Sequence, residues 1–195
     1  MNNSTTEWLS SYESSNYGTL FYSLVKIYQP KIVVELGTKA GYSAYHIAKG
    51  LKENNNGHLY CYDLWEKYPY NTVTMFDAEE NLKEFKDIVT LQQKDATKID
   101  KDYMSIDILH VDLSNDGEIL EKIIPNWLNK VNQLIILEGG SHIRDQAGWM
   151  IKYCKTPISK WLSNLKKIKD IQYITFDKFP SLTIIQTKQE NKDET

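Results

Sequence analysis

Apolar residues along the chain follow two spacings, one typical of amphipathic helices and one typical of buried strands. Helical spacing covers residues 20–28, 44–51, 73–85, 120–128 and 158–168. Short apolar runs that predict strands cover residues 31–36, 58–64, 88–92, 106–111, 133–137, 173–176 and 182–185. Pro30 ends the first helix, and Pro125 is expected to kink or divide the fourth. The pattern predicts strands that alternate with helices over most of the chain.

This alternation predicts the fold class. Strands separated by helices form a mostly parallel sheet with helices on both faces, so we expect an α/β fold. The last two predicted strands are joined only by a turn at residues 178–180, which indicates an antiparallel hairpin at one edge. We interpret residues 1–187 as one domain, with residues 1–30 as an N-terminal helical cap. Residues 188–195 are predicted to be a polar tail.

Composition excludes several classes of protein. The chain has 195 residues, 41% of them hydrophobic, and a net charge of −3, so it lacks the basic surface that a nucleic acid needs. The first ten residues do not resemble a signal peptide, and no segment reaches roughly 18 uninterrupted apolar residues. We therefore expect a soluble cytoplasmic protein.

Cys61 and Cys154 are interpreted as two buried thiols, in preference to a disulfide or a zinc site.

The first predicted strand leads into a glycine-containing loop, residues 35–43, which reads ELGTKAGYS. Gly37 can supply a tight turn, and Gly41 lets the next helix begin close to a ligand. A dinucleotide-binding loop needs a further glycine where this chain has Lys39, which argues against NAD. The carboxylate of Glu35 would repel phosphate but could orient an amino group. The loop therefore fits a nucleoside ligand without phosphates, or is simply a structural turn.

Acidic residues also follow the second and third predicted strands. Asp63 stands where a carboxylate can accept both ribose hydroxyls of a nucleoside, and its alternative roles are a helix cap or a solvated turn. Asp95 and Ala96 follow the third strand, where a short acceptor and a backbone N–H could read an adenine edge. The same pair is also common in ordinary turns.

These residues together resemble the class I S-adenosylmethionine-dependent methyltransferases. The resemblance covers residues 17–187 and is strongest to the catechol-type, small-molecule and sugar O-methyltransferases, whose loop commonly reads E-L-G-x-x-x-G-Y-S. It implies a Rossmann-like, seven-stranded, mostly parallel sheet with a C-terminal antiparallel hairpin. It also implies S-adenosyl-L-methionine as cofactor, the methionine part near Glu35, Gly37 and Ser43, and the ribose on Asp63. The full set of implied cofactor-binding residues is Glu35, Gly37, Thr38, Gly41, Ser43, Asp63, Leu64, Trp65, Asp95 and Ala96.

The same resemblance indicates which residues would bind a divalent metal ion if this chain were metal-dependent. Metal-dependent members have a carboxylate after the fourth strand and an acidic pair after the fifth, and Asp112 matches the first of these positions. Glu138 replaces the first member of the pair with a longer side chain, Gly139 replaces the second, and Asn115 replaces the catalytic lysine. We therefore predict activity without a divalent metal. If a metal were present, its ligands would be Asp112 and Glu138.

The segment after the fifth strand is the predicted site of acceptor chemistry. His142 is the best-placed general base, with Asp112 as its catalytic companion and Glu138 as an anchor for acceptor hydroxyls. Arg144 is the only arginine in the chain, and its planar fork suits an anionic group on the acceptor. The alternative for Arg144 is an ion pair with a neighbour such as Asp145.

Other aromatic and titratable residues receive simpler interpretations. His110 is interpreted as a core histidine, and His46 and His58 as surface residues. Aromatic side chains are candidates to wall the acceptor pocket. These aromatic candidates are Tyr17, Trp65, Tyr68 and Tyr70.

Three functions remain open at this point. The first is methylation of a small molecule, on the oxygen of a sugar or natural-product-like hydroxyl, by a protein that could form a homodimer and has no nucleic-acid or membrane partner. The second is a non-catalytic subunit that binds a nucleoside or adenosylmethionine. The third is an NAD-dependent oxidoreductase, since Tyr22 and Lys26 have the Y-x-x-x-K spacing of one reductase class, although they precede the first strand.

Overall fold

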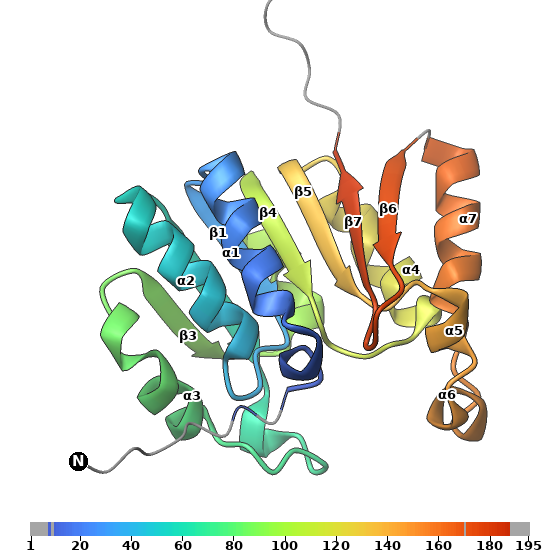
Figure 1. The fold of residues 1–195 in the computed structure, drawn as a ribbon, viewed down its shortest axis with the longest axis horizontal. Coiled ribbons are helices and arrows are strands. Elements are labelled where there is room, and N and C mark those ends of the chain that lie inside the picture. The colour runs from blue at the N-terminus through green and yellow to red at the C-terminus, as the bar shows by residue number, and fades with distance from the viewer. Residues whose placement is uncertain (1–7, 9, 170, 188–195) are drawn as a thin grey trace, which may run out of the picture. The chain divides into compact units, whose positions relative to one another are not determined.

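The computed structural model describes residues 8, 10–169 and 171–187, so the predicted tail at 188–195 and part of the predicted cap lie outside it. The chain divides into two compact units, residues 1–96 and 97–195. The strands form a seven-stranded sheet in the order β3-β2-β1-β4-β5-β7-β6 (Figure 1). The predicted α/β class, with its antiparallel C-terminal hairpin, is confirmed.

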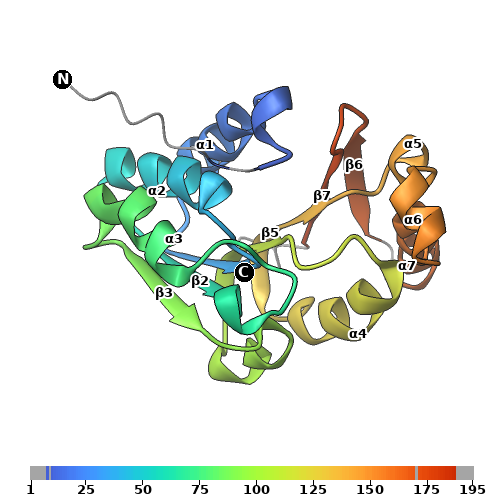
Figure 2. The same cartoon turned by 90° about the horizontal axis from the view of Figure 1, so that it is seen from below.

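The first unit alternates helices and strands as the apolar pattern predicts (Figure 2). Its elements are α1 (Tyr17–Tyr28), β1 (Ile32–Leu36), α2 (Tyr42–Asn54), β2 (His58–Asp63), α3 (Met75–Leu82) and β3 (Val89–Gln93). β2 pairs in parallel with both β1 and β3, with Cα register Glu35 to Cys61 and Asp63 to Gln93. Parallel pairing places the carboxyl ends of these three strands at one edge of the unit.

The two helices α1 and α2 pack closely because of a glycine. A Cβ on Gly18 would lie 2.3 Å from Nε2 of His46, so a larger residue would push the imidazole aside. His46 is half-buried in this contact, and burial lowers the pKa of its imidazole below the ordinary value. The expectation that His46 is a surface residue is therefore wrong, because the close approach of α1 covers it. His58 is also half-buried, and its Nε2 contacts Thr90 Oγ1 at 2.8 Å.

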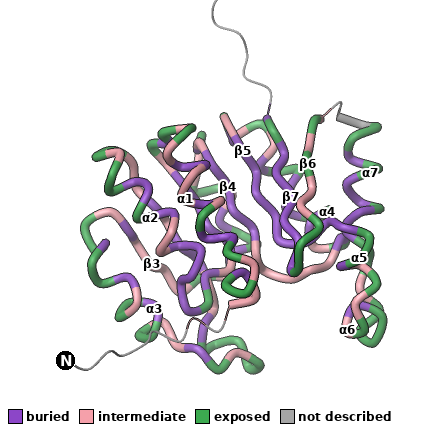
Figure 3. The backbone as a smooth tube through the Cα atoms, in the orientation of Figure 1, coloured by how far each residue is buried: buried purple, intermediate pink, exposed green. Residues whose placement is uncertain are grey.

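The second unit contains the rest of the sheet. Its elements are β4 (Ile106–Val111), α4 (Gly117–Trp127), β5 (Val131–Glu138), α5 (His142–Asp145), α6 (Gly148–Lys152), α7 (Ile158–Lys169), β6 (Gln172–Phe176) and β7 (Leu182–Gln186). β4 and β5 are parallel neighbours, and β7 lies antiparallel between β5 and β6. Figure 3 shows β4, β5 and β7 as mostly buried backbone, which accounts for their nearly continuous apolar sequences.

Three local expectations change in this unit. α4 runs through Pro125 as one helix, so the proline does not divide it. The segment after β5 contains the short helices α5 and α6, which are too short for apolar periodicity to reveal. Cys154 is exposed on the turn after α6, so only Cys61 is a buried thiol as expected. Within the described part of the chain, no helix is long and apolar enough to cross a membrane.

Candidate active site

The loop between β1 and α2 is shaped by left-handed backbone at three positions. Gly37 has φ +88°, Lys39 +50° and Gly41 +91°. The N–H of Gly37 donates to the Tyr62 carbonyl at 2.8 Å, and the N–H of Gly41 donates to the Thr38 carbonyl at 2.9 Å. Glycine adopts this conformation without steric cost, which explains the spacing of the two glycines in the sequence.

A buried hydrogen bond ties the start of α2 to the end of β1. Ser43 Oγ donates to Glu35 Oε1 at 2.6 Å, and both side chains are almost fully buried. Burial, and then the negative charge of Glu35, raise the pKa of the neighbouring Cys61 thiol well above its ordinary value. Cys61 is therefore held as a neutral thiol and is not a nucleophile. Glu35 and Ser43 lie together as the sequence predicts.

Asp63 joins the loop to the turn after β2. Its Oδ2 accepts hydrogen bonds from the backbone N–H groups of Thr38 at 2.9 Å and Lys39 at 2.8 Å. Its Oδ1 accepts from the N–H of Trp65 at 2.8 Å. A carboxylate offers about four acceptor positions, so three are already used by the backbone. Asp63 is thus a clamp between two loops as well as a candidate ligand-binding group.

The turn after β2 is fixed by side chains on both sides. Trp65 is fully buried, and its indole N–H donates to the Lys39 carbonyl at 2.8 Å. Gln93, at the end of β3, donates to the Leu64 carbonyl at 3.1 Å and to Glu66 Oε1 at 2.8 Å. Backbone N–H groups of Glu66 itself and of Met75, followed by Gln93, lower the pKa of the exposed Glu66 carboxyl.

Sequence reasoning missed two residues that support this part of the site. Gln93 is the last residue of β3, and a polar residue at the end of a strand is the signal that could have identified it. Asn81 on α3 donates to the Ala40 carbonyl at 2.9 Å, a contact that depends on packing and has no local signal. Asp95 is half-buried and Ala96 is buried directly after β3. The N–H of Lys94 donates to the Asp63 carbonyl at 3.1 Å, so the third strand end joins the same region.

In the second unit, Glu138 and Arg144 form a buried pair. Their exposed fractions are 8% and 6%, and Arg144 Nη2 lies 3.5 Å from Glu138 Oε1. The other carboxylate oxygen accepts a 2.5 Å hydrogen bond from Nδ2 of Asn115. Arg144 Nε donates to the Pro180 carbonyl at 2.9 Å. Glu138 and Arg144 therefore contact each other directly, which the sequence did not reveal.

The alternative that Arg144 forms an ion pair is confirmed, but its partner is Glu138 and not Asp145. Asp145 instead accepts hydrogen bonds from the backbone N–H groups of Ile158 and Ser159, both at 2.9 Å, and so caps α7. Adjacent residues on a helix point to different sides, which separates the two side chains.

His142 is exposed on the first turn of α5. Its Nδ1 lies 3.2 Å from Ser159 Oγ. The helix itself begins where Ser141 Oγ accepts the N–H of Arg144 at 3.1 Å. Asp112 is half-buried in the loop after β4.

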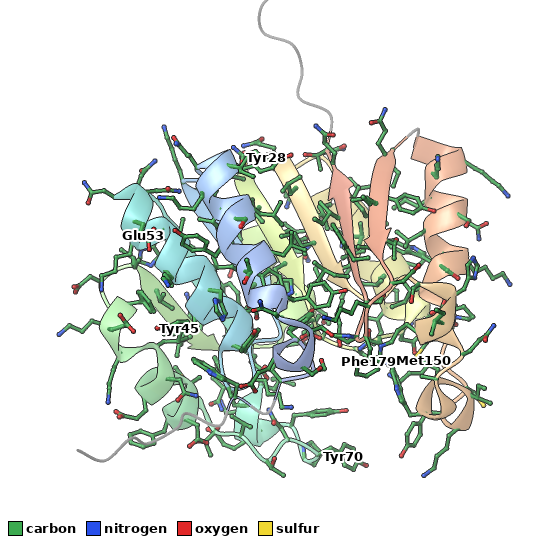
Figure 4. All side chains as sticks on the ribbon, viewed as in Figure 1. Tyr28, Tyr45, Glu53, Tyr70, Met150 and Phe179 are labelled. Atoms are coloured by element: carbon green, nitrogen blue, oxygen red, sulfur yellow. The ribbon has the colours of Figure 1, made fainter. Side chains whose placement is uncertain are left out.

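The remaining candidates differ in exposure. Tyr17 is buried, Tyr68 is half exposed and Tyr70 points away from its turn at 84% exposure (Figure 4). His110 is fully buried in β4, as expected for a core histidine. Over residues 8, 10–169 and 171–187, no group of three or more His, Cys, Asp or Glu side chains could hold a metal ion.

Comparison with known proteins places the chain in a family. A family model described as "Methyltransferase domain" matches residues 34–137, which is more than half of the chain. No curated protein sequence matches significantly.

Solved structures with the same fold are numerous. The "putative caffeoyl-CoA O-methyltransferase from Staphylococcus aureus" is 18% identical with a TM-score of 0.67, covering 95% of this chain and 93% of its own. The O-methyltransferase TomG from Streptomyces achromogenes, in complex with SAM, is 16% identical with a TM-score of 0.66, covering 89% and 80%. SAH-bound PaMTH1 from Podospora anserina is 17% identical with a TM-score of 0.66, covering 88% and 78%. The chain therefore belongs to the methyltransferase domain family and has the Rossmann-like fold of class I methyltransferases.

Proposed function

We propose that this protein is an S-adenosylmethionine-dependent O-methyltransferase that acts on a hydroxyl group of a small molecule, such as a sugar or a natural-product precursor. The observation that carries the proposal is the ELGTKAGYS loop, closed internally by the Ser43–Glu35 hydrogen bond and held from outside by Asp63. This loop lies within the segment matched by the methyltransferase domain.

The residues of the first unit fit the cofactor by the chemistry of their donors and acceptors. Glu35 supplies a buried negative charge for the amino group of the methionine part, and Ser43 fixes that carboxylate. Asp63 keeps about one acceptor position beyond its three backbone bonds, enough for one ribose hydroxyl. This refines the expectation that Asp63 accepts both hydroxyls.

The adenine ring of the cofactor is proposed to bind against the turns after β2 and β3. Leu64 is half-buried and available to contact a base, whereas Asp95 and Ala96 supply an acceptor and an N–H. Trp65 is fully buried beneath the loop, so its contribution is to hold Lys39 and the backbone around it. Thr38, Gly37 and Gly41 complete the backbone of the loop.

The second unit provides the proposed acceptor chemistry. The bound cofactor supplies an electrophilic methyl group, and the chain's own residues need only orient the acceptor oxygen and remove its proton. If His142 Nδ1–H donates to Ser159 Oγ, then Nε2 is the unprotonated nitrogen and can accept that proton. Asp112 and Glu138 are proposed to orient the acceptor.

Nicotinamide chemistry is disfavoured by the loop itself. Lys39 occupies the position where a dinucleotide-binding loop needs glycine, and Glu35 puts a negative charge where a pyrophosphate would approach. Tyr22 hydrogen-bonds Glu53 on the exposed surface of α1 and α2, which gives the Y-x-x-x-K spacing a structural explanation.

The test combines binding and turnover. Isothermal titration calorimetry with S-adenosylmethionine, S-adenosylhomocysteine and NAD should show binding of the first two at micromolar levels and none of NAD. Incubation with methyl-labelled S-adenosylmethionine and fractionated small-molecule extracts should yield S-adenosylhomocysteine and a labelled product. Binding without turnover in any extract would instead support a non-catalytic subunit. NAD binding without S-adenosylmethionine binding would contradict the family-based proposal itself.

A further inference from the structure

Arg144 is buried with unused hydrogen-bonding capacity. A guanidinium carries five N–H donors, and among the described contacts Arg144 makes one hydrogen bond, from Nε to the Pro180 carbonyl. Its Nη2 lies 3.5 Å from Glu138, longer than a strong charge-assisted hydrogen bond of about 2.8 Å. Its Nη1 is buried and has no hydrogen-bond partner. Such an arrangement is costly unless a further acceptor completes it.

Two aromatic rings lie against this guanidinium, and one of them, Trp149, also lies near a second cation. The Cζ of Arg144 lies 4.2 Å from the centroid of the Trp149 ring and 5.1 Å from that of Phe179. Lys155 Nζ lies 5.7 Å from the same Trp149 ring and donates to Ser114 Oγ at 2.6 Å. Phe179 is 55% exposed on the turn between β6 and β7, so on this side the guanidinium is covered by a ring that borders solvent. An approach to Arg144 from this side is therefore physically available.

The acidic residues of the same segment have hydrogen-bond partners of their own. Asp145 accepts backbone N–H groups of α7, and Asp116 accepts those of Glu118 and Thr156. Glu138 faces Arg144 but also bonds Asn115, whose Oδ1 is itself buried with no hydrogen-bond partner. The Glu138 carboxylate is thus flanked by one unused donor, on Arg144, and one unused acceptor, on Asn115.

We propose that these side chains form a recognition site for a carboxylate on the methyl acceptor, so that the substrate class is the hydroxy-carboxylates. The ligand carboxylate accepts from Nη1 of Arg144 and from Nζ of Lys155, and a hydroxyl of the same ligand donates to Oδ1 of Asn115. The planar edge of a guanidinium between two rings suits a planar carboxylate. The word acceptor rests on the function proposed above, whereas the carboxylate site stands on these contacts alone.

The test is direct binding, measured by calorimetry on the whole chain with and without S-adenosylhomocysteine. The probes are two matched pairs, 3-hydroxybenzoate with 3-hydroxybenzyl alcohol and glucuronate with glucose, together with inorganic phosphate. At least one carboxylate should bind about tenfold or more tightly than its neutral counterpart, because a hydrogen bond between charged groups is lost in the latter. Arg144→Gln and Lys155→Gln should each weaken that binding by about tenfold, and Arg144→Lys should weaken it less.

Lys152→Gln is the matched control. It removes the same charge three residues away along the chain, where Lys152 lies over Tyr153, and should leave carboxylate affinity unchanged. Thermal unfolding shows which variants remain folded, and Lys155→Gln changes a half-buried side chain that the fold tolerates more easily than loss of Arg144.

Four outcomes would overturn the proposal. These are equal binding of both carboxylates and their neutral partners, equal losses in Lys152→Gln and Lys155→Gln, binding of phosphate alone, and unchanged binding in a folded Lys155→Gln variant. S-adenosylmethionine binding is measured separately. Absence of carboxylate binding would therefore leave the proposed methyltransferase function intact, and absence of S-adenosylmethionine binding would leave the carboxylate site intact.

Discussion

Asp63 and Glu138 both stand at the end of a strand, one in each unit, yet their carboxylates are held by different kinds of groups. Asp63 accepts three backbone N–H groups from two neighbouring loops. Glu138 contacts the side chains of Asn115 and Arg144, which come from separate parts of the second unit. Backbone groups are present whatever residues the loop contains, whereas side-chain partners must be supplied by particular residues.

This difference is consistent with the different tasks proposed for the two regions. A carboxylate fixed by backbone makes a rigid loop that many sequences could build, which suits a site for an invariant part of a ligand. A carboxylate fixed by side chains can be retuned by single substitutions, which suits a site that selects among ligands. The predictions below test each half of this comparison.

The largest effect is expected from His142→Ala. Loss of a general base should lower turnover by about 10²- to 10⁴-fold, equivalent to about 3–5 kcal/mol in activation free energy. Affinity for S-adenosylmethionine should stay unchanged because the role proposed for His142 is toward the acceptor and not the cofactor. The measurement is turnover on the acceptor found by labelled extract screening, and Ile143→Ala, at an exposed neighbour on α5, serves as control. Equal turnover in the two variants would remove His142 from the mechanism.

Asp63→Ala should cost about 3 kcal/mol in the free energy of unfolding, since three N–H groups lose a charged acceptor. Affinity for S-adenosylmethionine should fall by a further 1–3 kcal/mol, roughly, for loss of a ribose contact. Denaturant unfolding and calorimetry measure the two effects. Asp87→Ala, at an exposed residue of the same unit, should change neither. A folded Asp63→Ala protein with normal stability would contradict the clamp.

Gly140→Ala should destabilise the second unit by about 2–3 kcal/mol, from left-handed backbone and crowding together. Gly140 has φ +107°, and a Cβ there would lie 2.1 Å from Oγ1 of Thr183, which donates to the Gly139 carbonyl. Gly148→Ala is the counterpart in open space at the start of α6 and should be neutral or stabilising by up to about 1 kcal/mol. Equal thermal midpoints for the two variants would count against this packing account.

Ser43→Ala should weaken S-adenosylmethionine binding by about 1–2 kcal/mol, because the buried Glu35 carboxylate loses the hydroxyl that orients it. Calorimetry on the folded variant measures this loss. Ser14→Ala, at an exposed serine of the same unit, is the control and should bind normally. Normal affinity in Ser43→Ala would show that Glu35 is positioned by β1 alone.

Removal of divalent metal should have no effect. Exhaustive EDTA treatment is expected to leave turnover unchanged, since both oxygens of Glu138 already face Asn115 and Arg144. Turnover is compared before and after treatment, with and without added Mg²⁺ or Mn²⁺. A complete loss of turnover that added metal restores would show that Asp112 and Glu138 do form a metal site.

Much of the fold could be predicted because helices and strands longer than about one turn leave a periodic trace in the sequence. The α5 and α6 helices have no more than five residues, so they leave no such trace, although Ser141 is a helix-capping residue that marks where α5 begins. The exposure of Cys154 was not predicted for the same reason, because the sequence pattern did not reveal the turn after α6.

The candidate residues of the two units differ in the same way. Residues 35–43 and Asp63 were identified from a short motif and its position after predicted strands, and the structure brings them into contact. The partners of Arg144 could not be predicted from a local pattern. Pro180 lies 36 residues away along the chain and meets Arg144 only when β7 packs beside β5, whereas the contacts with Glu138 and Trp149 depend on how the segment after β5 folds.

The sequence by itself determined the order of helices and strands, the glycine loop and the chemical character of the strand ends, because each of these depends on residues close together along the chain. The tertiary structure alone decided which lone pairs of Asp63 are occupied, that Trp65 lies beneath the loop, and that Arg144 faces Glu138 between two rings. Side-chain partnerships depend on packing between distant segments, and no local pattern of polar and apolar residues encodes them.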